Sequence, residues 1–339
     1  MNNTHIISPQ FLQRLEFTQE QLLSNIKAIA KQFKLGSILY IKGIEEGYED
    51  INIELKTTKG HYLVKILVDY LEKKPRSRED AEYYVYVMSQ LLEGGIRVPK
   101  LYMSSDNKHL FEISNQPKAP IFAIVMEYFE GKHFLQIKPT LKDMESIVLI
   151  LSKFHSLDLR LGDKVYDDPW QPQSLAKYYS INKKLFKQKD KHRLESIIRN
   201  LDRINLDHYK KTPTHGDIMR NNIMKSKEGE YCLLDFGVVA MNHWIIDLAL
   251  YLAGFCLDPS DSVSENKDIF KKVTSAYVAR SKLRNDFRDD LYILIQASYG
   301  AFYLASMLDK KLGGNESKEN SYWIDLGNRG MDMIDEMTK

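Results

Sequence analysis

The hydrophobic positions in the first third of the chain change from a helical period to a strand period. Residues 9–34 are predicted to be helical, with Thr18 as a suitable N-cap and apolar residues at helical spacing between Leu22 and Phe33. Runs rich in β-branched and aromatic residues then predict strands at 38–41, 51–56 and 61–67, with a Lys-Gly turn between the last two. This order predicts an antiparallel meander.

A further helix and two more strands complete this region. Residues 76–93 place their apolar side chains on one helical face, and two glycines end the pattern. Two strands follow, and the second, at 120–126, is almost continuously apolar, which predicts a central strand covered on both faces. Residues 127–131 break the strand pattern, and the chain from residue 141 onward is mainly helical in pattern, apart from one loop and its strand.

Composition and charge exclude several classes of protein. A chain of 339 residues suits two lobes, and a net charge of +2 gives no field to attract nucleic acid or an anionic membrane. Only two cysteines, Cys232 and Cys256, argue against a disulfide framework and fit a reducing compartment. We find no signal-peptide pattern and no apolar stretch of about 18 residues. We therefore expect a cytoplasmic protein with no nucleic-acid or membrane partner.

One segment carries candidate chemistry. Residues 215–222 read HGDIMRNN, and Asp235 opens an Asp-Phe-Gly sequence thirteen positions after Asn222. Asp217 and Asn222 keep the five-residue step of a kinase catalytic loop, and a predicted strand at 230–234 leads to Asp235. Each piece alone is compatible with an ordinary turn. Their joint spacing favours phosphoryl transfer.

The segment HGDIMRNN, with Gly216 where protein kinases have Arg, resembles the aminoglycoside phosphotransferase superfamily, which also holds choline kinases and one type of homoserine kinase. The resemblance implies an α+β, two-lobed, protein-kinase-like fold, with an N-terminal antiparallel sheet lobe carrying one main helix and a larger helical C-terminal lobe. It places a nucleotide-binding lobe at 1–126, a hinge at 127–131 and a helical catalytic and substrate lobe at 132–339. Asp247, in an Asp-Leu-Ala element like the family's, is expected to cap its helix and steady the catalytic loop.

The resemblance also implies a nucleotide site. Lys65, on the third predicted strand, is expected to hold the α- and β-phosphates, although a strand lysine is also compatible with a solvent-facing position. Its expected partner on the following helix is Glu82, with Glu79 as the substitute. The loop at 43–50 lacks a G-x-G-x-x-G sequence and carries four acids. Further nucleotide contacts are expected from one residue of this loop and two of the hinge: Gly47, Glu127 and Phe129.

The expected reaction is in-line transfer of a γ-phosphoryl group to a hydroxyl. Asp217 is the expected base, and Asn222 and Asp235 are the expected ligands of Mg²⁺. ATP is the expected donor, and GTP stays open as an alternative. His215 is expected to brace the loop, while Arg220 is either a contact of the γ-phosphate or the partner of a structural carboxylate.

The acceptor is harder to infer. Residues 247–259 and 298–303 resemble the homoserine kinase built on this fold, which favours a small amino alcohol or hydroxy amino acid. An aminoglycoside bound by Asp258, Asp261 and Glu265 is the alternative. A catalytically dead nucleotide-binding scaffold and a protein kinase also stay open, although the chain lacks the Ala-Pro-Glu element of protein kinases. Five aromatic residues are candidates either to enclose an amine or to form core: Trp244, Tyr251, Tyr299, Tyr303 and Trp323.

Overall fold

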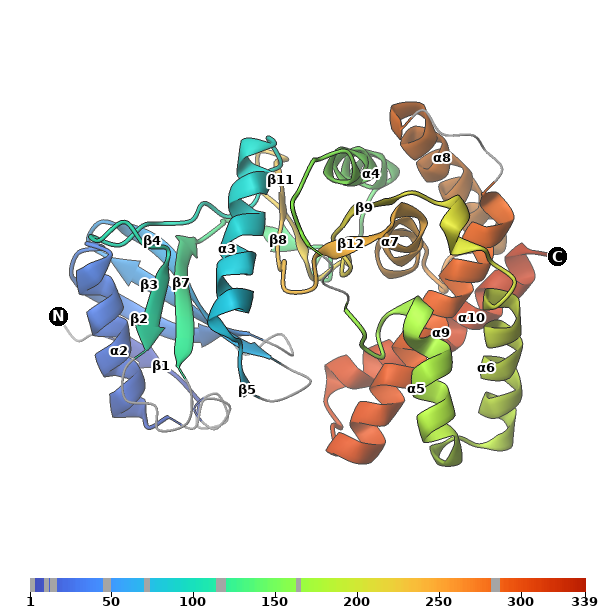
Figure 1. The fold of residues 1–339 in the computed structure, drawn as a ribbon, viewed down its shortest axis with the longest axis horizontal. Helices are drawn as coiled ribbons and strands as arrows, with labels where there is room; N and C mark the ends of the chain where they lie inside the picture. The colour runs from blue at the N-terminus through green and yellow to red at the C-terminus, as the bar shows by residue number, and fades with distance from the viewer. Residues whose placement is uncertain are drawn as a thin grey trace. The chain divides into compact units, whose positions relative to one another are not determined.

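The computed structural model describes residues 4–8, 12, 17–44, 50–69, 74–113, 120–162, 166–281 and 287–339 (Figure 1). The chain divides into two compact units. The first unit comprises residues 1–131 together with 232–234, and the second comprises residues 132–231 and 235–339.

The first unit is built on a seven-stranded sheet. Its strands run in the order β1-β2-β3-β4-β7-β6, with β5 paired to β4. Every neighbouring pair is antiparallel except β1 and β2, which are parallel. The predicted meander is therefore confirmed, while β1 is a three-residue strand that no sequence pattern indicated. The strands are β1 (Thr4–Ile6), β2 (Ile38–Ile44), β3 (Ile51–Thr57), β4 (Gly60–Asp69), β5 (Lys74–Pro75), β6 (Leu110–Ile113) and β7 (Ile121–Glu127).

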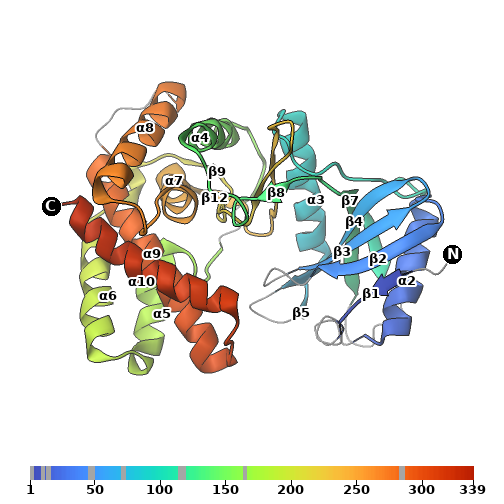
Figure 2. The ribbon, with the colours of Figure 1, turned by 180° about the vertical axis from the view of Figure 1, so that it is seen from behind.

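Two helices cover opposite faces of this sheet, α2 (Gln19–Gln32) and α3 (Arg78–Glu93) (Figures 1 and 2). Thr18 caps α2 through a reciprocal capping box with Gln21, as its sequence predicts. The rest of the expected N-terminal helical region, 9–11 and 13–16, lies outside the described residues. Side chains alternate along a strand, so Val64 of β4 belongs to the core under α2 while Lys65 lies on the α3 side.

Strand β7 has the burial that its apolar run predicts. Residues 121–126 are all buried, and the strand pairs with β4 on one edge and β6 on the other. It lies one strand from the edge of the sheet, because β6 follows it. A continuously apolar strand thus indicates cover on both faces and neighbours on both edges.

The second unit is mainly helical. Its α-helices are α4 (Leu141–His155), α5 (Leu175–Asn182), α6 (Gln188–Leu201), α7 (Trp244–Tyr251), α8 (Val263–Ser281), α9 (Arg288–Gly313) and α10 (Lys318–Met337). Shorter turns are η1 (Pro172–Ser174), η2 (Lys183–Leu185), η3 (Leu206–His208) and the π-helical η4 (Leu252–Cys256). The strands in this part of the sequence are β8 (Lys132–His133), β9 (Lys211–Thr214), β10 (Ile223–Lys225), β11 (Tyr231–Leu233) and β12 (Ala240–His243), of which β11 has residues 232–233 in the first unit.

Helices α7 and α9 form the centre of the second unit. Every residue of α7 is buried, and α9 packs against α5, α6, α7 and α10 (Figures 1 and 2). By length and composition α9 would pass as a membrane span, but 83% of its apolar window is buried inside the protein, as expected of a core helix. An antiparallel sheet unit and a helical unit together confirm the expected α+β class.

Candidate active site

The candidate catalytic loop connects β9 to β10 and is fixed at its start by one buried carboxylate. Asp247 accepts hydrogen bonds from the backbone N–H groups of His215, at 2.7 Å, and Gly216, at 2.8 Å. Gly216 has φ +76°, and a Cβ there would lie 3.0 Å from the carbonyl oxygen of Val238. This tight turn therefore requires glycine.

Asp247 is itself held by a buried network. His155, the last residue of α4, lies with Nε2 2.9 Å from Asp247 Oδ2 and Nδ1 2.6 Å from the Tyr277 hydroxyl. Burial opposes ionisation of Asp247, but the bond from His155 and the neighbouring histidine and backbone groups lower the pKa of its carboxyl. Asp247 steadies the catalytic loop as predicted. The expected helix cap is wrong, because α7 begins at Trp244 and has His243 as its N-cap residue.

Asp217 lies in the loop and is half-buried as a residue. Its Oδ2 accepts a 2.6 Å hydrogen bond from Asn222 Nδ2, and its backbone N–H donates to His215 Nδ1 at 3.3 Å. His215 is fully buried, and its expected role in bracing the loop stays a prediction. Burial first, and then the nearby Asp235 carboxylate, raise the pKa of Asp217 to about 7. A carboxylate with that pKa is suited to accept a proton near neutral pH.

Asp235 and Asn222 are the candidate metal ligands. Asp235 has φ +58°, a left-handed conformation that residues with a side chain rarely adopt and that is frequent at functional sites. The amide nitrogen of Asn222 bonds to the Asp217 backbone oxygen at 2.9 Å as well as to its carboxylate. Its amide oxygen is then the atom left to bind a cation. Among the described residues no group of three His, Cys, Asp or Glu side chains is placed to hold a metal ion.

A segment that sequence reasoning missed packs beside the catalytic loop. Asp168 is buried and accepts a 2.8 Å hydrogen bond from the Trp170 N–H, and burial raises the pKa of its carboxyl to about 6. Gln171 donates from Nε2 to the Gly216 carbonyl at 2.9 Å, and the Trp170 ring packs edge-on against Trp323. Asp168 also raises the pKa of Asp217, so the two carboxylates are electrostatic neighbours. The run Asp167-Asp168-Pro169 signals only a turn in the sequence.

Arg220 is bound to structural partners. Its Nε donates to the Phe255 carbonyl at 3.0 Å, and Nη1 lies 3.4 Å from Asp258 Oδ2. Of the two roles expected for Arg220, this contact matches the pairing with a structural carboxylate. Its role at the γ-phosphate stays a prediction.

The acids expected to bind an aminoglycoside already have partners. Asp261 forms an ion pair with Lys138 at 2.7 Å, and Glu265 accepts from the Ser262 hydroxyl and N–H. Asp258 accepts from Ser260 N–H in addition to its contact with Arg220. Little negative charge is therefore left over for a polycation.

The five candidate aromatic residues are all buried. Trp244 stacks on Tyr277, and the Tyr251 hydroxyl donates to the Met144 carbonyl, so both are core residues. Tyr299 differs, because its buried hydroxyl has no hydrogen-bond partner among the described residues. Burial raises the pKa of its phenol, and the charges of Arg220 and Asp258 also shift this pKa, so Tyr299 lies near that pair.

In the first unit, the prediction that Glu82 or Glu79 pairs with Lys65 is wrong. The Lys65 ammonium lies 3.0 Å from Asp50 Oδ2, and it also lies 5.0 Å over the ring of Tyr84. The side chain of Glu82 is 63% exposed and reaches Arg78 at 4.0 Å, while Glu79 is exposed as well. The reason is the rotation of α3 about its axis. The face that packs on the sheet carries Ala81, Tyr84, Val87, Met88 and Leu91, so Glu79 and Glu82 face solvent.

Two of the polar groups of Glu127, in the expected hinge, already have hydrogen-bond partners within the first unit. The carboxylate of Glu127 forms a bidentate ion pair with Arg97 at 2.6 and 2.9 Å, and its N–H donates to the Lys100 carbonyl. A nucleotide contact of Glu127 would thus use its carbonyl oxygen. Phe129 is buried, with the Arg97 guanidinium 5.3 Å from its ring centre. Gly47 lies outside the described residues.

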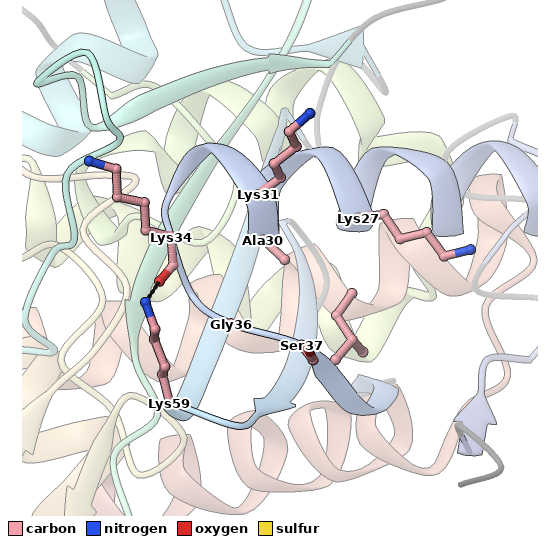
Figure 3. A pocket seen from close by; sticks show the side chains of 8 residues that line it. Lys27, Ala30, Lys31, Lys34, Gly36, Ser37 and Lys59 are labelled. Atoms are coloured by element: carbon pink, nitrogen blue, oxygen red, sulfur yellow. Dashed lines mark hydrogen bonds between the residues drawn. The ribbon is translucent and has the colours of Figure 1, made fainter.

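A separate hollow in the first unit has a different character. Its volume is about 620 Å³, and lysines from α2 and from the β3–β4 turn surround it (Figure 3). Lys59 Nζ donates to the Lys34 carbonyl at 3.1 Å, which ties the turn to the end of α2. None of the predicted site residues lines this hollow, so we assign it no part in phosphoryl transfer.

Comparison with known proteins agrees with this geometry. The sequence model of a family described as "Phosphotransferase enzyme family" matches residues 41–273. A homoserine kinase of Bartonella tribocorum is 24% identical over 247 residues, which cover 70% of this chain and 72% of the relative. Two solved structures share the fold: an amicoumacin kinase with AMP-PNP, Ca²⁺ and Ami (TM-score 0.68, 13% identity, 97% and 96% of the chains covered) and a microcompartment-associated aminopropanol kinase (0.63, 12%, 92% and 97%).

Proposed function

This chain belongs to the phosphotransferase enzyme family and is a kinase, and we propose that it transfers the γ-phosphoryl group of ATP to a hydroxyl of a small amino alcohol or hydroxy amino acid such as homoserine. The observation that carries the proposal is the environment of Asp217. Its carboxylate is held by Asn222, its pKa is raised to about 7, and its loop is anchored by Asp247. Such a group orients an acceptor hydroxyl and takes its proton.

We propose a metal site formed by Asn222 and Asp235, and a nucleotide contact made by Lys65. Asn222 Oδ1 and the Asp235 carboxylate would hold Mg²⁺, which neutralises charge on the β- and γ-phosphates when it is bound. Lys65 in the first unit would fix the α- and β-phosphates. The presence of Asp217, Asn222 and Asp235 together argues against a catalytically dead scaffold. ATP is the proposed donor, with GTP to be tested beside it.

The ion pairs of the helical unit support a small acceptor. Asp261 and Asp258 are paired with Lys138 and Arg220, so the region lacks the strong net negative charge that an aminoglycoside needs. The sequence likeness to homoserine kinases points in the same direction. We also propose a cytoplasmic enzyme without nucleic-acid or membrane partners, since both cysteines are free and buried and the net charge is close to zero.

The acceptor proposal is tested by a substrate panel. Purified protein is supplied with ATP or GTP, Mg²⁺ and, in turn, homoserine, choline, ethanolamine, aminopropanol, methylthioribose and kanamycin. We expect nucleotide-dependent product from a small hydroxylated amine or amino acid and none from kanamycin, measured by ADP or GDP release and by mass of the phosphorylated product. Efficient phosphorylation of kanamycin with no turnover of the small acceptors would reverse the acceptor proposal and leave the kinase assignment standing.

The metal assignment is tested by Asp235→Asn. The substitution keeps the volume and removes a ligand charge, so we expect the Mg²⁺ concentration for half-maximal nucleotide binding to rise about tenfold or more, together with a loss of turnover. Titration of a fluorescent nucleotide with Mg²⁺ gives the first quantity without relying on activity. Coinciding Mg²⁺ titrations of variant and parent would leave Asp235 with a structural role only.

A further inference from the structure

Asp50, just before β3, is a buried acid that lies beside Lys65, the lysine expected to bind the nucleotide phosphates. Its side chain is 1% exposed and those of Lys65 and Arg76 are 5% and 7% exposed. Oδ1 accepts from the Val68 N–H at 2.8 Å and from Arg76 Nε at 3.3 Å, while Oδ2 lies 3.0 Å from the Lys65 ammonium. All of these groups belong to the first unit, so the cluster forms within one compact part of the chain.

The two oxygens of Asp50 are held differently. Oδ1 is fixed by two hydrogen bonds, so the carboxylate cannot turn freely. Oδ2 has no partner with hydrogen-bond geometry among the described residues, and its contact with Lys65 is electrostatic. Asp50 therefore acts on Lys65 through its charge.

The surroundings of Lys65 exclude an equivalent anion from the packed face of α3. That face presents Ala81 and Tyr84 to the sheet, and the Tyr84 ring lies under the ammonium. In kinases the strand lysine must be held by an acid, usually a glutamate of the following helix. Here the exposed Glu82 lies toward Arg78 instead. The acid beside Lys65 is Asp50, which directly precedes β3.

We propose that Asp50 is the positioning residue for Lys65, acting from the start of β3 in place of a helix glutamate, with Arg76 and the Val68 N–H fixing the carboxylate. This inference rests on the proposed function, because it takes Lys65 to be the residue that holds the nucleotide phosphates. Asp50 itself need not touch the nucleotide. Its loss should therefore displace Lys65 and weaken nucleotide use while leaving the acceptor site unchanged.

The experiment compares Asp50→Asn with the parent in nucleotide binding and in steady-state kinetics. We expect the Kd and KM for ATP to rise about tenfold and kcat to fall, with the KM of the acceptor within twofold of the parent value. Glu112→Gln, which breaks an exposed ion pair with Arg78 in the same unit, is the matched control and should behave as the parent. Glu82→Gln is the rival variant, and a loss of ATP binding there with normal Asp50→Asn would overturn the proposal.

Lys65→Ala separates this inference from the proposed function. Normal ATP binding by Lys65→Ala would contradict the role of Lys65 in the proposed function. A defect in Lys65→Ala with a normal Asp50→Asn would contradict the role of Asp50 alone. In the double variant we expect no loss of ATP binding beyond that of Lys65→Ala, since Asp50 acts through the lysine. If Asp50→Asn does not fold, Asp50→Glu keeps the charge but displaces the carboxylate, and an unchanged KM for ATP in that variant would count against the proposal.

Discussion

Asp217→Asn is expected to lower kcat by about 10²–10⁴-fold while the Kd for ATP stays within about threefold of the parent value. The substitution preserves volume and an oxygen acceptor for Asn222 Nδ2, so the 2.6 Å contact inside the loop can persist. The substitution removes the carboxylate that we propose takes the proton of the acceptor hydroxyl. Rates from coupled ADP release, with ATP binding measured by calorimetry, distinguish this loss from a loss of nucleotide affinity.

The control for this prediction is Asp202→Asn, which removes an exposed carboxylate from the same unit and should leave both quantities unchanged. Circular dichroism spectra of the two variants and the parent should coincide. Turnover of Asp217→Asn above about a tenth of the parent rate is inconsistent with a base role for Asp217. The loop would then act mainly by binding and orienting the substrates.

Asp247→Ala is expected to destabilise the protein by about 3–5 kcal/mol. The alanine leaves two buried backbone N–H groups, those of His215 and Gly216, without their acceptor and removes the partner of His155 Nε2. Urea unfolding followed by tryptophan fluorescence reports the change. The exposed Asp268, paired with Lys272 one helical turn away, gives the control variant Asp268→Ala, which should stay within about 0.5 kcal/mol of the parent.

The effect of Asp247→Ala should also depend on pH in a defined direction. Interactions in the folded state lower the pKa of Asp247 below its ordinary value of 3.8. The ionised carboxylate therefore stabilises the fold fully above pH 3.8, and this contribution is lost as pH falls through the lowered folded-state pKa. We expect the full difference between variant and parent at pH 7 and a smaller one below pH 3.8. A difference that grew on acidification would contradict an ionised Asp247 in the folded protein.

The contact between Asp217 and Asn222 could be predicted from the sequence because the two residues are close along the chain. Gly216, Asp217 and Asn222 all lie in the short segment 216–222, so their spacing in the sequence already restricts how far apart they can be. The strands of the first unit were also predictable, since an apolar run at 120–126 indicates burial wherever its neighbours come from. These features depend on short-range patterns that tertiary structure does not overturn.

The partner of Lys65 could not be predicted, because tertiary packing decides it. Glu79 and Glu82 share a helical face, but nothing in the sequence states how far α3 is rotated about its axis over the sheet. A rotation of about 100° per residue means that one position more or less turns a side chain from the sheet to solvent. Asp50 was visible only as one of four acids in a loop, and its pairing with Lys65 and Arg76 needed the folded sheet.

The contacts that anchor the loop were hidden for a related reason. His155 and Asp247 are 92 positions apart, and Gln171 reaches Gly216 across 45 positions. No periodicity connects such pairs, so only the packing of helices against one another brings them together. Asp247 was recognised as a structural acid of the loop, but its contact with His155 on α4 was not foreseen, and the helix cap expected of it is absent.

The buried chain from Tyr277 through His155 and Asp247 to the loop has a consequence for local unfolding. It connects α8, α4 and α7 with the backbone amides of His215 and Gly216. Hydrogen exchange at those two amides requires that Asp247 separates from them, and this in turn disturbs three packed helices. The two amides should therefore be among the slowest to exchange in the second unit. The turn of the candidate catalytic loop then belongs to the most stable cooperative folding unit of the helical region, although most loops exchange rapidly.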